Sequence, residues 1–407
     1  MRQGKPIQCV LESAQLINRW MGKIYMKKIG FIGYGLRSQT MMKAFGTVQA
    51  PFEVAAIADP RNKELEESLQ GQQEFKNTVY YATAEQMLEN ERLDGVFLGT
   101  RCDLHSKYAK YVLAQNIPLF LEKPVCINEE QYAELLEASQ NANDRVVVSF
   151  PLRLTCIVQE MRAMVASGRL GDITSVQAIN NVPYGSVYYN SWYRDTRLTG
   201  GLFLQKATHD IDYITYILGK RPVQVMARTA KMYFKGERPM GLHCPMCPQY
   251  HTCPESSYVA KNIEARDVAG DCCCFAVDTG NEDVGAALFV CEDGTIINYH
   301  QTFLVKRTAG RRGARFIGTK ATAEFDFYSG DIRVDEYHWE HTALHHFEYP
   351  SPMHFGGDIQ LALAFAEVLA GKRSRCTLQS GLASAAACLA AKKAAELRVE
   401  MPINYGF

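Results

Sequence analysis

The sequence lacks an excess of charge of either sign, long apolar runs and internal repeats. Its 44 basic and 44 acidic residues cancel, and no block of like charge stands out. Nucleic acid is therefore not an expected partner. No apolar run approaches the roughly 18 to 20 residues needed to cross a bilayer, and charged residues interrupt even the alanine-rich C-terminal region. A membrane span is not expected.

Residues 1–25 lack the pattern of a secretory signal. Their most apolar part, 9–17, is interrupted by Glu12 and Gln15, whereas a signal needs an uninterrupted apolar core. We interpret 1–25 as an N-terminal extension, either disordered or derived from an upstream start codon. Without export the protein is expected in the cytoplasm, where its 13 cysteines would be free thiols or metal ligands rather than structural disulfides.

Length and composition predict two domains, because 407 residues with 47% apolar content exceed what one core usually serves. Residues 26–150 alternate short apolar runs with amphipathic stretches of helical length, which is typical of a doubly wound parallel sheet, the Rossmann arrangement. The expected strands are 28–32, 53–58, 95–99, 118–121 and 146–149, and the expected helices are 63–70, 84–91 and 105–115.

Residues 151–407 have a different pattern and predict an α+β domain for substrate binding and oligomerisation. Most of its strands belong to an open, mainly antiparallel sheet, with Glu292-Asp293-Gly294 as a hairpin turn. The expected strands are 172–180, 223–233, 284–291, 295–304, 312–318 and 322–327, and the expected helices are 157–167, 200–218, 355–369 and 378–397.

A glycine-rich turn follows the first expected strand. Gly33 permits a tight turn, and Gly35 lets the backbone approach a pyrophosphate that would sit on the N-terminus of the next helix. Ser38 replaces the third glycine of the dinucleotide fingerprint. Because G-x-G alone is weak, its position between a strand and a helix carries the prediction.

Asp59 ends the second strand, 26 positions after Gly33. A carboxylate there hydrogen-bonds the ribose hydroxyls of NAD and repels the additional phosphate of NADP. Arg61 leaves NADP open, because an arginine near this position accommodates that phosphate, although it could equally be a solvated residue at a helix start. We therefore expect NAD, with NADP as the alternative.

Glu122-Lys123-Pro124 follows the strand 118–121 and resembles a motif of the Gfo/Idh/MocA oxidoreductases. Other matching features extend over nearly the whole chain from Met26: Gly33 to Arg37, Thr100 to His105, Arg153, and Gly200-Gly201 leading to His209 and Asp212. The resemblance implies a Rossmann domain, an open-sheet domain, a cleft between them, and dimers or tetramers. It also implies cofactor contacts from Leu36, Arg37, Thr100, His105, Glu122 and Lys123.

Lys123 also has a physical case, since residues just beyond strand ends face the ligand crevice of such sheets. A cation there stabilises the alkoxide that develops as hydride leaves. The alternative is a surface lysine fixed by the turn before proline.

The family's relay of an aspartate and a histidine four residues later is altered here. Gln205 stands at the aspartate position, Lys206 follows, and His209 matches the histidine. A subset of the family resembles this Lys-x-x-His arrangement. Two lysines near one cleft should lower the pKa of one of them, so we expect His209 as the principal acid/base and Lys206 as an auxiliary base or substrate anchor. Packing roles are the alternatives.

Several other residues are candidate contacts for a polyhydroxylated ligand. They are Arg153, Tyr184, Tyr193, Gln205 and His354. For the tyrosines and Arg153 a stacking or core role is the alternative. His354 belongs to His354-Phe355-Gly356-Gly357-Asp358, which either closes the substrate pocket or only forms the turn before a helix.

A cysteine cluster is the least expected feature. Cys244 and Cys247 have chelate spacing, and Cys253 is a third candidate ligand. The fourth could be His251 or one of Cys272, Cys273 and Cys274. Strong zinc sites usually pair two such motifs, and only one is present. We therefore favour a packed or redox-sensitive thiol loop over structural zinc.

The predicted function is an NAD(P)-dependent dehydrogenase or reductase that acts on a hydroxyl of a sugar, cyclitol or sugar derivative. Two alternatives stay open. One is glycoside cleavage through transient oxidation by a recycled, bound NAD. Gln205, in place of the usual aspartate, leaves this alternative open. The other is a nucleotide sensor without catalysis, which the retention of Lys123 and His209 disfavours.

Overall fold

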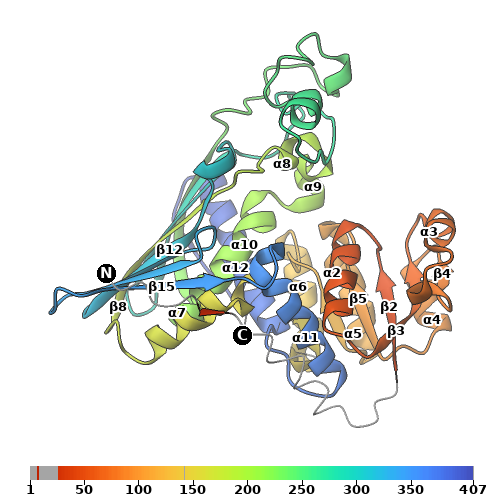
Figure 1. Ribbon diagram of the computed structural model, residues 1–407, viewed down its shortest axis with the longest axis horizontal. Helices are drawn as coiled ribbons and strands as arrows, with labels where there is room; N and C mark the ends of the chain where they lie inside the picture. The colour runs from red at the N-terminus through yellow and green to blue at the C-terminus, as the bar shows by residue number, and fades with distance from the viewer. Residues whose placement is uncertain (1–6, 9–25, 142, 407) are drawn as a thin grey trace. The chain divides into compact units, whose positions relative to one another are not determined.

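The computed structural model describes residues 7–8, 26–141 and 143–406, and it divides into two compact units (Figure 1). The parallel-sheet unit contains residues 26–159 and Phe347–Ala386, and the antiparallel-sheet unit contains Glu160–His346 and Ala387–Asn404. Apart from 7–8, the predicted N-terminal extension lies outside the described residues. The expected boundary after residue 150 does not account for Phe347–Ala386, which belong to the parallel-sheet unit.

The parallel-sheet unit is built on six parallel strands in the order β4-β3-β2-β5-β6-β7. All five expected strands are present, and short β4 is an addition. The order places β2 at the centre, so the turn after β2 lies where the strand order reverses and ligands of such sheets bind. The strands are β2 (Lys27–Ile32), β3 (Phe52–Ala58), β4 (Val79–Tyr81), β5 (Gly95–Leu98), β6 (Leu119–Leu121) and β7 (Val146–Val148).

Helices cover the sheet (Figure 1), and aromatic side chains pack between them and the strands. Phe97 of β5 stacks on Phe120 of β6 at 4.6 Å between ring centroids, and Phe365 of α11 meets Phe120 edge-on at 5.6 Å. A helix from near the C-terminus thus completes this core. The α-helices are α2 (Leu36–Thr47), α3 (Asn62–Leu69), α4 (Ala84–Asn90), α5 (His105–Ala114), α6 (Glu129–Ala138) and α11 (Gly357–Leu369).

The antiparallel-sheet unit is built on most of a ten-stranded sheet in the order β1-β15-β14-β13-β12-β8-β11-β10-β9-β16. Its pairs are antiparallel except β1 with β15 and β11 with β8. The fold class predicted from the sequence is confirmed. The strands are β1 (Ile7–Gln8), β8 (Ile173–Asn181), β9 (Pro222–Ala230), β10 (Val284–Cys291), β11 (Ile296–Thr302), β12 (Arg311–Gly318), β13 (Ala321–Asp326), β14 (Asp331–Glu336), β15 (Thr342–Glu348) and β16 (Met401–Pro402).

One face of this sheet is buried against helix α10 (Thr208–Leu218), beside β8 and β12 in Figure 1. Along β9, Val225 and Ala227 are buried while Met226 and Arg228 are exposed, as the two-residue period of a strand requires. The remaining helices are α7 (Cys156–Ala166), α8 (Val187–Asn190), α9 (Thr196–Thr199) and α12 (Leu378–Leu397). The division between the units falls within α7 and α12.

The expected helix 200–218 is not uniformly α-helical. Residues Phe203–Ala207 form a π-helical segment, η7, and α10 starts only at Thr208. A π-turn contains an additional residue and is frequent at functional sites. Gln205 and Lys206 lie in η7 and His209 in α10, so the regular one-turn spacing expected for these residues is altered.

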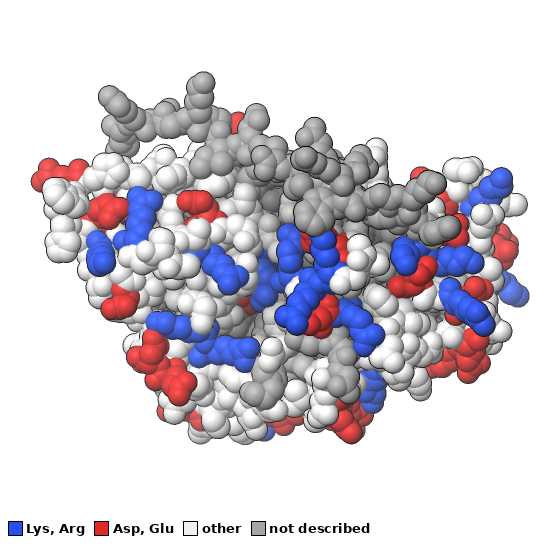
Figure 2. Space-filling view, turned by 90° about the horizontal axis from the view of Figure 1, so that it is seen from below, with Lys and Arg blue, Asp and Glu red and all other residues white. Residues whose placement is uncertain are grey.

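The surface agrees with the composition. On the face drawn in Figure 2, Lys and Arg side chains lie interspersed with Asp and Glu side chains, as the equal numbers of the two signs lead one to expect. Within the described ranges, no helix is both long and apolar enough to cross a membrane. Eleven described cysteines carry free thiols, as predicted, and Cys156 differs because it is disulfide-bonded.

Residues 231–283 connect β9 to β10 and contain little regular secondary structure among their described residues. Asp283 holds the start of this segment. Its fully buried carboxylate accepts hydrogen bonds from the backbone N–H groups of Met232, Tyr233 and Phe234, each at 2.7 Å. One side chain therefore satisfies three donors where the chain leaves the sheet.

We expect Asp283→Ala to lower the free energy of unfolding by about 3 kcal/mol, because each buried donor left unpaired costs about 1–3 kcal/mol. Urea unfolding followed by circular dichroism measures the loss. Asp283→Asn is the matched control and should lose less, because the amide keeps one acceptor oxygen. Equal stability of Asp283→Ala and the wild type would contradict this role.

Candidate functional site

The turn after β2 has the geometry that a dinucleotide pyrophosphate needs. Gly33 has a φ of +81°, and a Cβ there would lie 2.9 Å from the carbonyl oxygen of Gly99. Gly35 caps helix α2 without a side-chain cap, and a Cβ there would meet nothing within 4 Å. The space beside Gly35 at the start of α2 is thus open, which suits an anion at a helix N-terminus.

Ser38 substitutes for the third glycine without loss of close packing. Its buried hydroxyl donates a 2.8 Å hydrogen bond to the Gly33 carbonyl and so fixes the turn. A Cβ at Gly99 would lie 2.6 Å from the Ser38 oxygen. The replacement of the third glycine by Ser38 is therefore offset by the hydrogen bond from its hydroxyl to Gly33.

Asp59, at the end of β3, is held by its neighbours. Its carboxylate accepts hydrogen bonds from the Tyr34 N–H at 2.9 Å and from Arg61 through both the backbone N–H and the guanidinium. Burial alone would raise the pKa of Asp59, but these hydrogen bonds outweigh it and lower the pKa. Arg61 is thus turned toward Asp59, and the carboxylate stays charged.

Arg37, in the first turn of α2, joins three separate parts of the parallel-sheet unit. It donates to Glu122 after β6 at 2.7 Å, to both oxygens of Asp358 in α11 at 2.9 and 2.8 Å, and to Ser149 at 3.1 Å. His354 Nδ1 lies 3.0 Å from Oδ2 of the same carboxylate. Arg37, Glu122 and His354, all predicted as ligand contacts, therefore form one ionic network.

The charge state of this network is fixed by its members. Burial would raise the pKa of Asp358, but the positive charges and hydrogen bonds of His354 and Arg37 lower it well below its usual range. Both carboxylates are buried, whereas Arg37 is partly exposed. The Asp358 carboxylate is therefore buried and bonded to Arg37 and His354, rather than only capping α11.

Lys123 follows Glu122 directly, is half-buried, and precedes Pro124 through a cis peptide bond. His105 supports this turn, because its ring nitrogens lie 2.7 Å from the Pro124 carbonyl oxygen and 3.2 Å from that of Thr100. Burial lowers the pKa of His105. His105 and the Thr100 backbone thus hold the Lys123–Pro124 turn, in addition to any cofactor contact.

In the antiparallel-sheet unit, Lys206 is buried in an aromatic and cationic environment. Its ammonium donates to the Tyr184 hydroxyl at 2.5 Å and lies 4.7 and 5.9 Å from the ring centroids of Tyr184 and Tyr188. Burial lowers the pKa of Lys206 well below its usual value, the charge of Arg312 lowers it further, and Asp210 opposes this. A lysine pKa was expected to fall, but its causes are burial and Arg312.

Asp210 and Arg312 form a buried ion pair that the sequence analysis missed. Arg312 Nε donates to Asp210 Oδ1 at 2.7 Å, and Nη2 lies 2.6 Å from the same oxygen as an ion pair. Asn180 and Tyr299 donate to Oδ2 at 2.6 and 2.7 Å. The pair joins α10 to β8, β11 and β12. Arg312 shares the buried register of Ala314 and Phe316 on β12, and a charged residue in that register signals a partner.

The other predicted residues are distributed over both units. Gln205 and His209 are buried near the start of α10, and Tyr193 stacks on Trp192 at 4.0 Å between ring centroids. In the parallel-sheet unit, Arg153 is buried, with its guanidinium 6.0 Å from the Phe150 ring centroid. Leu36 is 81% exposed beside Gly35.

Comparison with protein families gives two matches along the chain. Residues 27–150 match the model described as "Oxidoreductase family, NAD-binding Rossmann fold", and residues 158–324 match the "GFO/IDH/MocA C-terminal domain". The resemblance predicted from the motifs is confirmed, and so is the predicted NAD-binding fold.

The named relatives share only low sequence identity with this chain. The chain is 26% identical to the putative oxidoreductase YteT of Bacillus subtilis over 349 residues, 76% of this chain and 79% of that protein. It is 23% identical to the rhizopine catabolism protein MocA of Rhizobium meliloti over 51% of this chain and 62% of that protein.

Solved structures share the fold. A myo-inositol 2-dehydrogenase from Lactobacillus plantarum has a TM-score of 0.68 at 16% identity, covering 93% of this chain and 100% of that chain. A levoglucosan dehydrogenase in complex with NADH has a TM-score of 0.72 at 16% identity, covering 93% and 99%.

We expect Arg37→Gln to lower the free energy of unfolding at pH 7 by about 2–3 kcal/mol, because it leaves two buried carboxylates without their cation. Because the pKa of Asp358 is lower in the folded state, its ionised carboxylate stabilises the fold at pH values above its unfolded pKa of about 3.9. That contribution disappears as pH falls through the folded value, so the difference from the wild type should shrink in acid. Urea unfolding at several pH values tests this.

Arg333→Gln is the matched control, because Arg333 pairs with Asp335 at the surface. It should change stability by less than about 0.5 kcal/mol. A loss for Arg37→Gln no larger than that of the control would contradict the role of the network.

Proposed function

The chain belongs to the Gfo/Idh/MocA family of NAD-binding oxidoreductases, and we propose that it transfers hydride between nicotinamide and a hydroxyl-bearing carbon of a sugar, cyclitol or sugar derivative. The observation that carries the proposal is Lys206, a buried lysine with a lowered pKa beside Tyr184. A strongly perturbed lysine in such a position is a candidate for proton transfer.

The residues of the parallel-sheet unit fit a dinucleotide. Gly33 and Gly35 leave the α2 N-terminus open for a pyrophosphate, and the charged Asp59 suits ribose hydroxyls. Because Arg61 is already bonded to Asp59, we propose NAD rather than NADP. When bound, nicotinamide supplies the hydride acceptor or donor, and the remaining chemistry falls to the protein.

Oxidation of a hydroxyl-bearing carbon requires the oxygen to lose its proton as hydride leaves. We assign His209 as the principal acid/base and Lys206 as an auxiliary base, because a lysine with a lowered pKa is uncharged over more of the pH range. Lys123 is assigned to stabilise negative charge on the reacting oxygen. Thr100, His105 and Glu122 support the Lys123 turn.

The candidate substrate contacts are polar and aromatic side chains, which suit a polyhydroxylated substrate. Tyr184 is 45% exposed with its hydroxyl bonded to Lys206, and Tyr193 presents a ring stacked on Trp192. Gln205, Arg153 and His354 add amide, guanidinium and imidazole donors. Among relatives, one protein is named an inositol 2-dehydrogenase and one structure a levoglucosan dehydrogenase with NADH and levoglucosan.

The direct test is a panel of sugars, inositols and sugar derivatives, assayed for NADH and NADPH formation with each cofactor. We expect net NADH formation with at least one member. Product formation with only catalytic NAD would favour glycoside cleavage instead, and nucleotide binding without turnover on any panel would favour a sensor.

We expect Lys123→Met, Lys206→Met and His209→Ala each to lower kcat by about 10²-fold or more with NAD affinity retained. In the wild type the rate should rise with pH as Lys206 loses its proton. The midpoint of this rise in rate should lie well below the ordinary lysine pKa of about 10.4. The rise should be absent from Lys206→Met.

Lys110→Met is the matched control, because Lys110 pairs with Glu134 on the surface of α5 and α6. Its kcat should equal that of the wild type. Unchanged rates for the three site variants, with NAD bound, would remove the assignment.

We further propose that the protein is a cytoplasmic homodimer or homotetramer, in which the disulfide-bonded Cys156 is an exception among the free thiols. The exposed face of the larger sheet carries apolar side chains in neighbouring strands, with Met226 opposite Leu288 and Ile296 nearby along β11. Such a face is suited to a second copy of the chain.

Met226→Asp should weaken self-association at least about tenfold, because an unpaired charge is costly in an apolar interface. Light scattering across protein concentrations measures this. Met240→Asp, at an exposed methionine in 231–283, should leave the association unchanged. A monomeric wild type would contradict the proposal.

A further inference from the structure

The segment 231–283 contains six of the cysteines and needs a source of stability other than regular hydrogen bonding. Its described helical elements are η8 (Cys244–Met246) and the π-helical η9 (Val259–Ile263). Chain segments with little secondary structure or core are commonly stabilised by disulfides or metal ions. All six of these cysteines, Cys244, Cys247, Cys253, Cys272, Cys273 and Cys274, are free thiols.

The backbone already arranges the thiols. The Cys247 N–H donates to the Cys244 carbonyl at 3.0 Å, which closes a tight turn over the C-x-x-C motif. Cys244 N–H donates to Asp271 and Cys273 N–H donates to Leu242, so the two stretches run antiparallel with His243 opposite Cys272. Residues 20 to 30 positions apart are thus held side by side.

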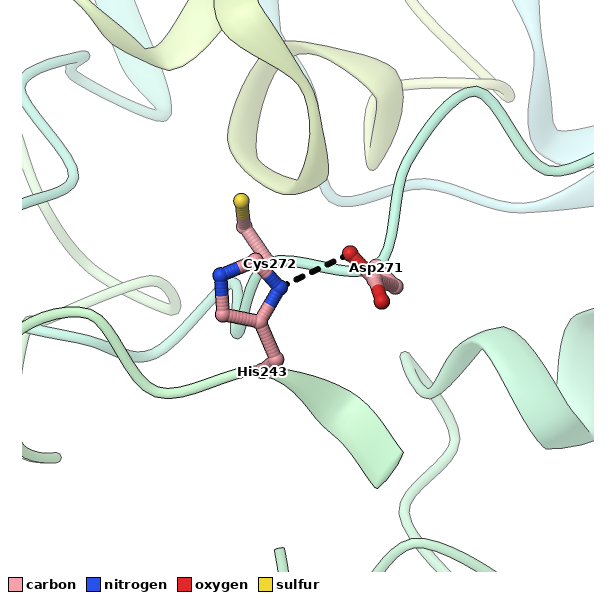
Figure 3. Close-up of side chains that lie close together, drawn as sticks. All are labelled: His243, Asp271 and Cys272. Carbon is pink, nitrogen blue, oxygen red and sulfur yellow. Dashed lines mark hydrogen bonds and ion pairs between the residues drawn. The ribbon is translucent and has the colours of Figure 1, made fainter. Parts of the chain in front are cut away.

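The pairing gives these stretches two different faces. Cys244 and Cys273 are buried, whereas His243 and Cys272 are more exposed. On the outer face, His243 Nδ1 lies 2.8 Å from Asp271 Oδ1, and Figure 3 shows this pair beside Cys272. The inner and outer faces therefore offer separate sets of metal-ligating groups.

On the inner face, one small cavity is lined by five cysteines, Cys244, Cys247, Cys253, Cys273 and Cys274. Its volume of about 10 Å³ is room for a single water-sized atom. The cysteines come from the turn, from the loop after it and from the facing stretch. Four of these thiols would complete the ligand set of structural zinc.

Charged groups lie beside the thiols. Glu255 is buried in the cavity wall, and its Oε2 accepts a hydrogen bond from Lys306 at 2.7 Å, so this carboxylate already has a cation. Arg238 donates to the Cys247 sulfur at 3.1 Å, a contact that suits a thiolate.

We propose that this cavity is a structural zinc site with Cys244, Cys247, Cys253 and Cys273 as its four ligands. On binding, the thiols release their protons to solvent and four Zn–S bonds form, with no change in oxidation state. Arg238 offsets part of the resulting negative charge. The site adds Cys273 to the three cysteines that the spacing suggested, and Cys273 is one of the later cysteines that the sequence offers as a fourth ligand.

The outer trio is the competing location. His243, Asp271 and Cys272 have ligand atoms within 4.8 Å of one another, and they are the only such group in the described ranges. Among the described residues, no three of the inner sulfur atoms lie that close to one another, so zinc binding at the inner site requires them to move together. Zinc favours the inner set, because four thiolates in a buried space outweigh one thiolate with a half-exposed imidazole and carboxylate.

The experiment is elemental analysis of full-length protein purified without a polyhistidine tag. The wild type should hold about one zinc per chain, and Cys247→Ser and Cys273→Ser should each fall below about a tenth of that. His243→Ala and Cys272→Ser should keep the metal, as should Cys291→Ser, which removes a buried thiol from β10.

Cobalt substitution of the wild type covers the case in which a ligand variant fails to fold. The thiolate-to-cobalt absorption band should have the intensity of four thiolates. Absence of metal, the intensity of a single thiolate, or retention of zinc by Cys247→Ser with loss from His243→Ala would overturn the proposal. These readouts do not depend on hydride transfer, so they stand apart from the proposed activity.

Discussion

The parallel-sheet unit depends on one guanidinium group. Arg37 connects the first helix after the glycine turn to Glu122 after β6 and to Asp358 near the start of α11. Its fork matches the two oxygens of Asp358, which a lysine could not do. Because Glu122 precedes Lys123, the same contact that anchors α11 also fixes the chain beside the candidate cation.

The antiparallel-sheet unit repeats this solution with different residues. Arg312 and Asp210 are both buried, and Asn180 and Tyr299 complete the hydrogen bonds of the carboxylate. Removing one partner of such a pair is far more costly than never having the pair. The arrangement also sets the field around Lys206, since Arg312 lowers the pKa of that lysine while Asp210 opposes the shift.

The sequence was informative wherever local pattern decides structure. Short apolar runs located most strands, and β10 and α12 were placed with their observed bounds. The glycine turn and Asp59 followed from backbone and charge requirements that act over a few residues. The π-turn of η7 could not be predicted, because inserting one residue into a helix leaves no mark in its composition. Asp358 meets Arg37 across 321 positions, and no local pattern encodes such a pairing.

The position of α11 in the parallel-sheet unit has a consequence for biosynthesis. Phe365 packs against Phe45 and Phe120, and Asp358 is the partner of Arg37, yet both lie in Phe347–Ala386, after the whole of Glu160–His346 in the chain. A ribosome therefore exposes the Rossmann strands long before it delivers the helix that completes their core. This unit must wait, partly formed, for almost the entire chain to be synthesised, so the two units mature together rather than in chain order.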